Sequence, residues 1–155
     1  MSSAAATETA PIRGCTCSKL RRLTRRVTAV YDRALAPAGM RVTQYSVLAH
    51  LRRAPGSALS ALAEAMDMDR TTLTRNLKPL VDAGWVEMGS SPDDARVRTV
   101  KLTARGEAQY QTARSFWRRA QSEVTATIGH AGTSDLHELI DQYLPLFRPA
   151  EEESE

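Results

Sequence analysis

The sequence contains one pair of short segments in which apolar and polar residues alternate, and this limits the folds open to the chain. The segments are Trp85–Met88 and Arg98–Leu102, and Gly89–Asp94 between them has turn chemistry at nearly every position. A single hairpin cannot make a sheet large enough to carry a core. Elsewhere the apolar residues recur at steps of three and four, as in amphipathic helices. The sequence therefore predicts a mainly α protein with a small β-hairpin.

Local signals mark the expected helix ends. Asp69 and Thr103 can accept hydrogen bonds from free N–H groups at helix starts, and Thr43 is a further candidate cap. Gly84 suits the residue that follows a helix, and Gly129–Gly132 should break the long helical stretch after the hairpin. The helices expected from periodicity and these signals are Lys19–Leu35, Thr43–Arg53, Ser60–Met66, Arg70–Ala83, Ala104–Ile128 and Ser134–Phe147.

The order of helix, turn, helix and hairpin in the middle of the chain predicts a winged helix-turn-helix. If Leu73, Leu77 and Leu80 face the core, the second helix of the pair turns hydroxyl groups and cations outward. Arginine can bind guanine edges, threonine can contact phosphates or thymine methyl groups, and a helix N-terminus attracts phosphate. The alternative is a solvated helix face without a partner. The candidate recognition residues are Arg70, Thr71, Thr72, Thr74, Arg75 and Lys78.

The hairpin is the candidate wing. Arg96 and Arg98 lie at or just past its tip, within reach of a narrow minor groove, and Asp94 is placed to brace an arginine by a charge-assisted hydrogen bond. Ser57 and Ser60 are candidates for contacts to the DNA backbone. The alternative is a surface loop of mixed charge.

The distribution of charge qualifies the DNA-binding hypothesis. The net charge is +3, and arginine supplies 18 of the 21 basic residues. Arginine suits bidentate contacts to phosphates and bases, although a GC-rich genome would give the same bias. Residues 57–102 carry six basic and seven acidic residues, so binding would depend on local segregation of charge. The arginine-rich helix over Lys19–Leu35 is a candidate source of additional positive potential.

The ends of the chain and its aromatic content suggest how it is organised. Residues 1–14 lack a basic start and an apolar stretch, so we expect a disordered leader and not a signal peptide, and no segment is long enough to span a membrane. The expected location is the cytoplasm. The few large side chains favour a core completed by a second subunit. The expected regions are 15–56 for dimerisation and support, 57–102 for the winged helix-turn-helix, 103–148 for C-terminal dimerisation helices and 149–155 for an acidic tail.

Several runs together resemble the MarR family of transcriptional regulators. They are Leu59–Ala63, Asp69–Arg75 and Leu80–Gly84, followed in the hairpin by Asp94-x-Arg96 and then Val100-x-Leu102-Thr103-x-x-Gly106. The resemblance covers about Leu20 to Phe147. It implies a homodimer with interlocked first and last helices, whose winged lobes bind adjacent major grooves of a pseudo-palindromic duplex. It also implies a repressor that a small ligand or oxidation releases. One departure is Pro79 inside the recognition helix, which should bend or loosen that helix.

The protein could be released from DNA by oxidation of its cysteines or by binding of a small ligand. Cys15 and Cys17 lie near cations and a helix start, which favours a reactive thiolate, and a disulfide between subunits is open, although inert thiols are the alternative. The other route is a small aromatic or anionic effector. Its candidate pocket residues, each of which also suits core or surface, are Tyr31, Tyr45, His50, Arg52 and Trp117.

The sequence shows no sign of catalysis. It contains no P-loop, nucleotide-binding fingerprint or paired-carboxylate motif, and Cys15 and Cys17 lack the further ligands that zinc requires. We therefore expect no metal, no cofactor and no enzymatic activity. The alternative function is a helical protein-interaction module without sequence-specific DNA binding.

Overall fold

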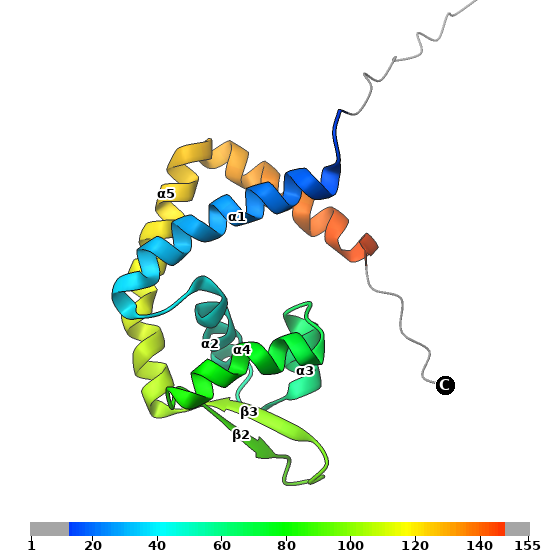
Figure 1. Ribbon diagram of the computed structural model, residues 1–155, viewed down its shortest axis with the longest axis vertical. Helices are drawn as coiled ribbons and strands as arrows, with labels where there is room; N and C mark the ends of the chain where they lie inside the picture. The colour runs from blue at the N-terminus through cyan, green and yellow to red at the C-terminus, as the bar shows by residue number, and fades with distance from the viewer. Residues whose placement is uncertain (1–12, 148–155) are drawn as a thin grey trace, which may run out of the picture.

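The structure is a computed structural model that describes residues 13–147, so residues 1–12 of the expected leader and the whole of the expected acidic tail, 149–155, lie outside this range. The chain forms an open, C-like outline (Figure 1). A helical arm lies at one end, a winged lobe lies at the other, and the first half of a long helix connects them. The elements are α1 (Thr16–Leu35), η1 (Ala36–Ala38), α2 (Val42–Arg53), β1 (Ser57–Ala58), α3 (Leu59–Ala65), α4 (Arg70–Asp82), β2 (Val86–Ser90), β3 (Arg98–Leu102), α5 (Ala104–Tyr143) and η2 (Leu144–Phe147).

The winged lobe is built around leucine side chains from its short helices. The 3–4 spacing on α2 and α4 brings these residues to one face of each helix, as the periodicity predicts. Val81 of α4 is 38% exposed and is not part of this core. Val86 and Val100 close the core from the sheet, and Ala113 closes it from α5. The fully buried side chains of this core include Leu48, Leu51, Leu73, Leu77 and Leu80.

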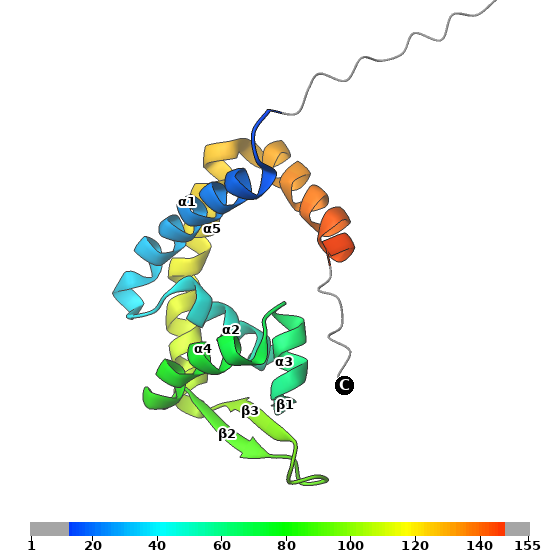
Figure 2. The ribbon, with the colours of Figure 1, turned by 45° about the vertical axis from the view of Figure 1, so that its right-hand side comes forward.

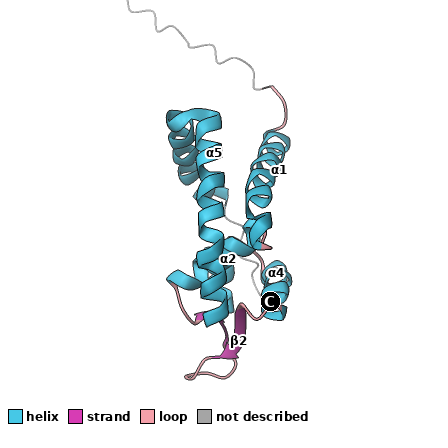
Figure 3. Ribbon diagram, turned by 90° about the vertical axis from the view of Figure 1, so that its left-hand side faces the viewer, coloured by secondary structure: helices cyan, strands magenta, loops and turns pink. Residues whose placement is uncertain are grey.

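The sheet has three strands, one more than the expected hairpin. Figure 3 shows strand β2 at the end of the molecule that lies away from the arm. Strand β3 lies in the middle with β2 and β1 antiparallel on either side, and Ser57 and Ala58 of β1 pair with Val100 and Thr99. A strand of two residues is too short to show an alternating pattern, so the sequence does not reveal it. The hairpin itself is confirmed: β3 has the expected bounds, whereas β2 begins one residue later, at Val86, and extends to Ser90.

The predicted caps at Asp69 and Thr103 are confirmed. The carboxylate of Asp69 accepts a hydrogen bond from the backbone N–H of Thr72 at 2.8 Å, and the hydroxyl of Thr103 accepts one from Gly106 at 3.0 Å. Gly84 has the left-handed backbone that a residue after a helix needs, with φ of 69°. Helix α4 includes Pro79 and continues through it to Asp82, so the proline does not end the helix.

The starts of α1 and α2 differ from the expectation, and α3 also begins one residue earlier than expected, at Leu59. Helix α1 begins at Thr16, so Cys17 lies within its first turn. Helix α2 begins at Val42, and its N-cap is Arg41, not Thr43. Arginine has no acceptor for a free N–H group, and the carboxylate of Asp32 in α1 accepts the hydrogen bond from Val42 instead. A cap from a different helix leaves no local signal in the sequence.

The long helix α5 bends back at Gly129, where the expected break lies. Gly129 has φ of 78° and ψ of 162°, values outside the helical range, and the helical path resumes directly after it, earlier than the expected start at Ser134. Figures 1 and 2 show the second half of α5 bending away from the first at the end of the molecule where α1 begins, so that α1 and this half of α5 form the arm.

Candidate nucleic-acid interface

The outward face of α4 carries all the predicted recognition residues. Arg70, Thr71, Thr72, Thr74, Arg75 and Lys78 are exposed, while the leucines of the same helix are buried. The hydroxyl of Thr72 donates to Asp69 at 2.5 Å, and that of Thr74 donates to the carbonyl oxygen of Arg70 at 2.7 Å. These bonds give both threonines a structural task within the helix. They do not occupy the guanidinium groups of Arg70 and Arg75.

The cations on this face differ in their partners. The ammonium group of Lys78 lies 2.8 Å from a carboxylate oxygen of Asp82 one turn along the helix. Neither Arg70 nor Arg75 takes part in an ion pair within residues 13–147. The hydrogen bonds from Thr72 lower the pKa of Asp69, so this carboxylate stays ionised at the positive end of the helix. The arginines are therefore the cations most free to bind an external anion.

Asp94 shapes the tip of the wing in a different way from the one predicted. Its carboxylate accepts a hydrogen bond from the backbone N–H of Arg96 at 2.9 Å, and its carbonyl oxygen accepts one from Val97 at 3.0 Å. The expected bond from the carboxylate to an arginine side chain is not formed among the described residues. Asp94 thus holds a turn in the backbone, and the side chains of Arg96 and Arg98 remain exposed.

The two predicted backbone-contact serines lie at the start of the helix-turn-helix. Ser57 in β1 donates its hydroxyl hydrogen to the carbonyl oxygen of Ala54 at 2.5 Å, and Ser60 is exposed in the first turn of α3. Between α3 and α4 the chain turns at Asp67, a non-glycine residue with φ of 52°. Aspartate tolerates this left-handed conformation better than most residues, which permits so short a turn.

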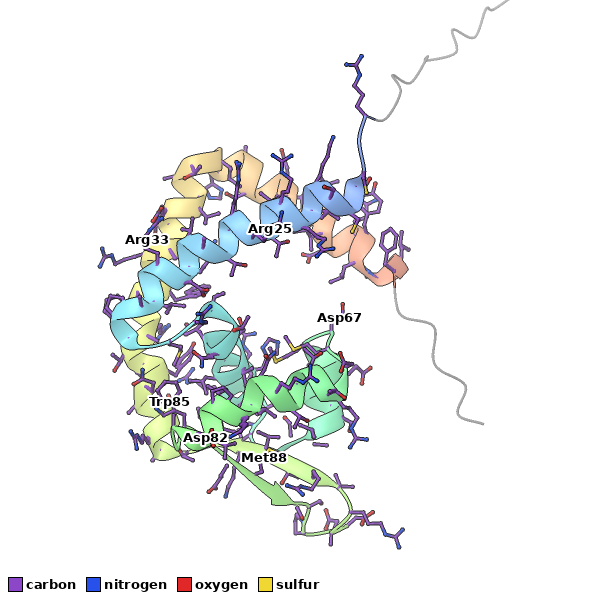
Figure 4. All side chains as sticks on the ribbon, in the orientation of Figure 1. Arg25, Arg33, Asp67, Asp82, Trp85 and Met88 are labelled. Atoms are coloured by element: carbon purple, nitrogen blue, oxygen red, sulfur yellow. The ribbon has the colours of Figure 1, made fainter. Side chains whose placement is uncertain are left out.

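The arginine-rich helix α1 does not adjoin this surface. Figures 1 and 2 place α1 at the opposite end of the molecule from the tip of the β2–β3 hairpin, and Figure 4 shows Arg25 and Arg33 on the arm. Physiological salt screens exposed charges beyond about 8 Å. Within one chain, the arginines of α1 therefore lie away from the tip of the wing, and a contribution of α1 to the potential at the recognition helix stays a prediction.

The five predicted pocket residues do not line one cavity. Tyr45 is buried and stacks between Tyr110 and Trp117, with ring centroids 5.1 and 5.6 Å away. Burial raises the pKa of Tyr45 and that of Tyr31, whose hydroxyl donates to Gln121 at 2.6 Å. The pattern of apolar positions places an aromatic residue on the inward face but cannot distinguish packing from ligand binding.

The remaining two residues also lie apart. The ring nitrogen Nδ1 of His50 is 2.8 Å from the carbonyl oxygen of Ser46 one turn earlier in α2. The guanidinium of Arg52 pairs with Glu107 at 2.9 Å and lies 5.2 Å from the centre of the Tyr110 ring. Hydrogen bonds from Gln111 and Arg52 lower the pKa of Glu107, which keeps this ion pair charged at neutral pH.

Arg52 and Tyr31 line two separate cavities. The cavity beside Arg52 has a volume of about 530 Å³ and lies where the end of α2 meets the start of α5. The cavity beside Tyr31 has a volume of about 700 Å³ and lies between α1 and the two halves of α5. The first is lined by Leu51, Arg52, Pro55, Gly56, Lys101, Leu102, Thr103, Ala104 and Glu107.

Cys15 and Cys17 are free thiols exposed at the start of α1. Cys15 is the N-cap residue with an extended backbone, and only Cys17 lies in the helix. Within residues 13–147, no three His, Cys, Asp or Glu side chains gather in a way that could hold a metal ion, and no helix is long and apolar enough to cross a bilayer.

The geometry defines a class of protein. A capped helix with exposed arginines and threonines follows a short helix and a tight turn. The hairpin that carries Arg96 and Arg98 lies in the same lobe (Figure 1). This is the architecture of a winged helix-turn-helix of the kind that binds duplex DNA.

Comparison with known proteins narrows the class. Residues 38–97 match the family model described as "MarR family". The chain is 38% identical over 74 residues to the multiple antibiotic resistance protein MarR of Escherichia coli. This matched region covers 48% of this chain and 51% of MarR. It is 30% identical over 95 residues to the HTH-type transcriptional repressor Rv2887 of Mycobacterium tuberculosis. This matched region covers 61% of this chain and 68% of Rv2887. The chain thus spans about half the length of MarR and two thirds of Rv2887.

Solved structures of MarR-family regulators superimpose on this chain. The M. tuberculosis transcriptional regulator MosR in complex with DNA superimposes with a TM-score of 0.74 and 38% identity, over 86% of this chain and 99% of MosR. A cysteine-to-serine mutant of E. coli MarR in complex with operator DNA superimposes with a TM-score of 0.76 and 26% sequence identity. The superposition covers 83% of this chain and 93% of the MarR chain. The chain belongs to the MarR family. These relatives support a DNA-binding transcriptional regulator over the alternative of a helical protein-interaction module.

Proposed function

We propose that the protein is a transcriptional repressor that binds a pseudo-palindromic DNA operator as a homodimer in the cytoplasm and has no enzymatic activity. The observation that carries the proposal is the exposed face of α4, where Arg70 and Arg75 lack ion-pair partners among the described residues and the capped helix start attracts phosphate. The N-terminal turns of α4 would enter the major groove. Arg96 in the wing would contact the neighbouring minor groove, and Ser57 and Ser60 the DNA backbone.

A second copy of the chain is proposed to cover the arm. Large apolar side chains of α1, α5 and η2 are exposed, and Leu146 and Phe147 are exposed by 72% and 79%. Exposed apolar surface on this scale marks an interaction site. The 700 Å³ cavity between α1 and α5 lies beside these residues and would be filled in the dimer. The other exposed apolar residues of this surface are Leu20, Leu23, Ile128, Leu139, Ile140, Tyr143 and Leu144.

The proposal is tested by footprinting the full-length protein on DNA flanking its own gene. The expected footprint covers two half-sites about one helical turn apart, with one dimer bound. Sedimentation of the complex gives the stoichiometry. Protection of a single half-site by one chain, or the absence of any protected sequence, would contradict the proposal.

Arg96→Ala is expected to weaken binding to operator and to unrelated DNA by a similar factor. The side chain lies at the wing tip, where it would contact the phosphates and the minor-groove edge and would carry little base-specific information. The slope of log affinity against log salt should become shallower by about one. Fluorescence anisotropy across a salt series measures both quantities. Arg21→Ala, in the exposed part of α1, is the matched control and should leave the slope unchanged.

We propose that a small aromatic carboxylate acts as effector in the cavity beside Arg52. Its volume of about 530 Å³ falls within the usual range for small-molecule sites. A ligand carboxylate would compete with Glu107 for the Arg52 guanidinium. Benzoate, the simplest probe, should therefore bind Glu107→Gln more tightly than the wild type and Arg52→Ala more weakly, as calorimetry would show. Equal affinity in all three proteins would exclude this cavity.

Oxidation is the second proposed route of release. Both thiols are exposed, and hydrogen peroxide can join a cysteine of each subunit in a disulfide with the release of water. Peroxide is expected to lower operator affinity and to give a covalent dimer on a non-reducing gel. The double variant Cys15→Ser/Cys17→Ser should show neither effect. Wild-type binding that peroxide leaves unchanged would assign these cysteines no sensing role.

A further inference from the structure

Side chains from two helices hold the segment that joins the arm to the winged lobe. This segment, residues 36–41, connects α1 to α2. The carboxylate of Asp32 in α1 accepts a hydrogen bond from the backbone N–H of Val42 at 2.8 Å. From the other side, the side-chain amide of Gln109 in α5 donates to the carbonyl oxygen of Ala38 at 2.6 Å. The connection is thus held near its middle, at Ala38, and where it enters α2, at Val42.

We call residues 36–41, together with the contacts that hold them, the joint. Among the described acidic side chains, only that of Asp32 accepts a hydrogen bond from the start of α2 at this joint. It is the only acidic residue between positions 13 and 35, and its side chain is 26% exposed. The N-cap residue Arg41 cannot accept a hydrogen bond from the start of α2, so Asp32 supplies the acceptor. Its negative charge also complements the positive end of the α2 dipole. The guanidinium of Arg41 lies 3.9 Å from the same carboxylate.

The orientation of α2 determines that of the recognition helix. Val47, Leu48 and Leu51 of α2 are fully buried in one core with Leu73 and Leu77 of α4. Protein interiors are packed to crystal-like density, so these two helices move as one body. A rotation of α2 about its N-terminus would therefore carry α4 and the wing with it. Figure 2 shows α2 between the joint and α4.

We propose that Asp32 is a positioning residue that fixes the winged lobe on the arm and thereby sets the half-site spacing that the operator must have. The inference rests on the proposed function, in which the arm holds two lobes together. Two recognition helices reach successive major grooves only when their separation matches the helical repeat of DNA. A rigid joint makes one spacing much better than its neighbours. A loose joint tolerates several spacings and binds the best one less tightly, because the lobes must be ordered on binding.

The first test measures affinity for duplexes whose half-sites are separated by spacers that change in single base-pair steps. The wild type should show a sharp optimum. Asp32→Ala should bind about fivefold more weakly at the optimum, the effect of one lost helix cap, and less than twofold more weakly at spacers two base pairs away. Asp32→Asn keeps an acceptor oxygen and should retain the sharp profile. Glu123→Gln, which removes an exposed ion pair of the arm with Arg33, is the control and should match the wild type.

Gln109→Ala provides a second variant that loosens the joint from the opposite side, and it should flatten the profile as Asp32→Ala does. A uniform loss of affinity at every spacing in both variants would show a general defect of the lobe and overturn the proposal. An unchanged profile in both would overturn it as well.

The second test needs no DNA. Spin labels at Ala29→Cys and Ser90→Cys, both at exposed positions, report the distance between arm and wing within one chain when the labelled protein is diluted with unlabelled protein. The labelled chain also carries Cys15→Ser and Cys17→Ser, so that only the two introduced thiols react. The distribution of distances between the two labels should be narrow in the protein that retains Asp32 and broader in Asp32→Ala. Equal widths would exclude the positioning role. If the wild type has no preferred spacing, the proposed operator geometry fails, while the distance distributions still decide the role of Asp32.

Discussion

Replacing Gly106 by alanine is expected to destabilise the folded protein by about 3 kcal/mol, at the upper end of the cost of overpacking. A Cβ atom at this position would lie 1.9 Å from the carbonyl oxygen of Trp85 and 2.7 Å from a methyl carbon of Leu102. The first of these is a backbone atom, which a side-chain rotation cannot move. The first turn of α5 would have to separate from the segment that joins α4 to β2, which contains Trp85, and from the end of β3.

Urea denaturation of the purified variant measures this loss, and the wing should become mobile with it because β3 leads directly into α5. Gly132→Ala is the matched control, since its Cβ would find its nearest neighbour at an ordinary 3.8 Å. Alanine is also the better helix former, so the control should be neutral or slightly more stable. A Gly106→Ala protein within about 1 kcal/mol of the wild type would contradict this close packing.

Arg75→Ala is expected to reduce affinity for the operator by roughly tenfold to a hundredfold, the value of one good bidentate base contact. Affinity for unrelated DNA should fall much less, so that the specificity ratio falls. The physical reason is that Arg75 is exposed on the outward face of α4 and has no ion-pair partner among the described residues, so its guanidinium can bind a base edge.

Competition binding with operator and scrambled duplexes measures both affinities. Arg25→Ala removes an arginine from the arm, at the far end of the molecule from the wing (Figure 4), and should change neither affinity. An equal loss on both duplexes would make Arg75 a phosphate contact. No loss on either would remove it from the interface.

Much of the recognition helix could be predicted from the sequence because its signals are local. The 3–4 spacing of leucines determines which face of α4 is buried and leaves the arginines on the other. The Asp69 cap requires only residues three apart, and the structure confirms it. The ligand pocket could not be predicted in the same way. Tyr45 and Arg52 suit both a ligand and a core, and only their neighbours from α5 show that Tyr45 stacks in the interior while Arg52 pairs with Glu107.

The amino-acid sequence alone determined the mainly α class, the helix-turn-helix followed by a hairpin, and the caps at Asp69 and Thr103, because periodicity and capping act between residues a few positions apart. The tertiary structure decided the contacts between residues that are far apart in the sequence. The two-residue strand β1 exists only because β3 pairs with it, and α2 receives its cap from Asp32 ten residues earlier. It also decided that the arginines of α1 lie away from the wing (Figure 1). Such contacts depend on how the helices pack, which no short stretch of sequence encodes.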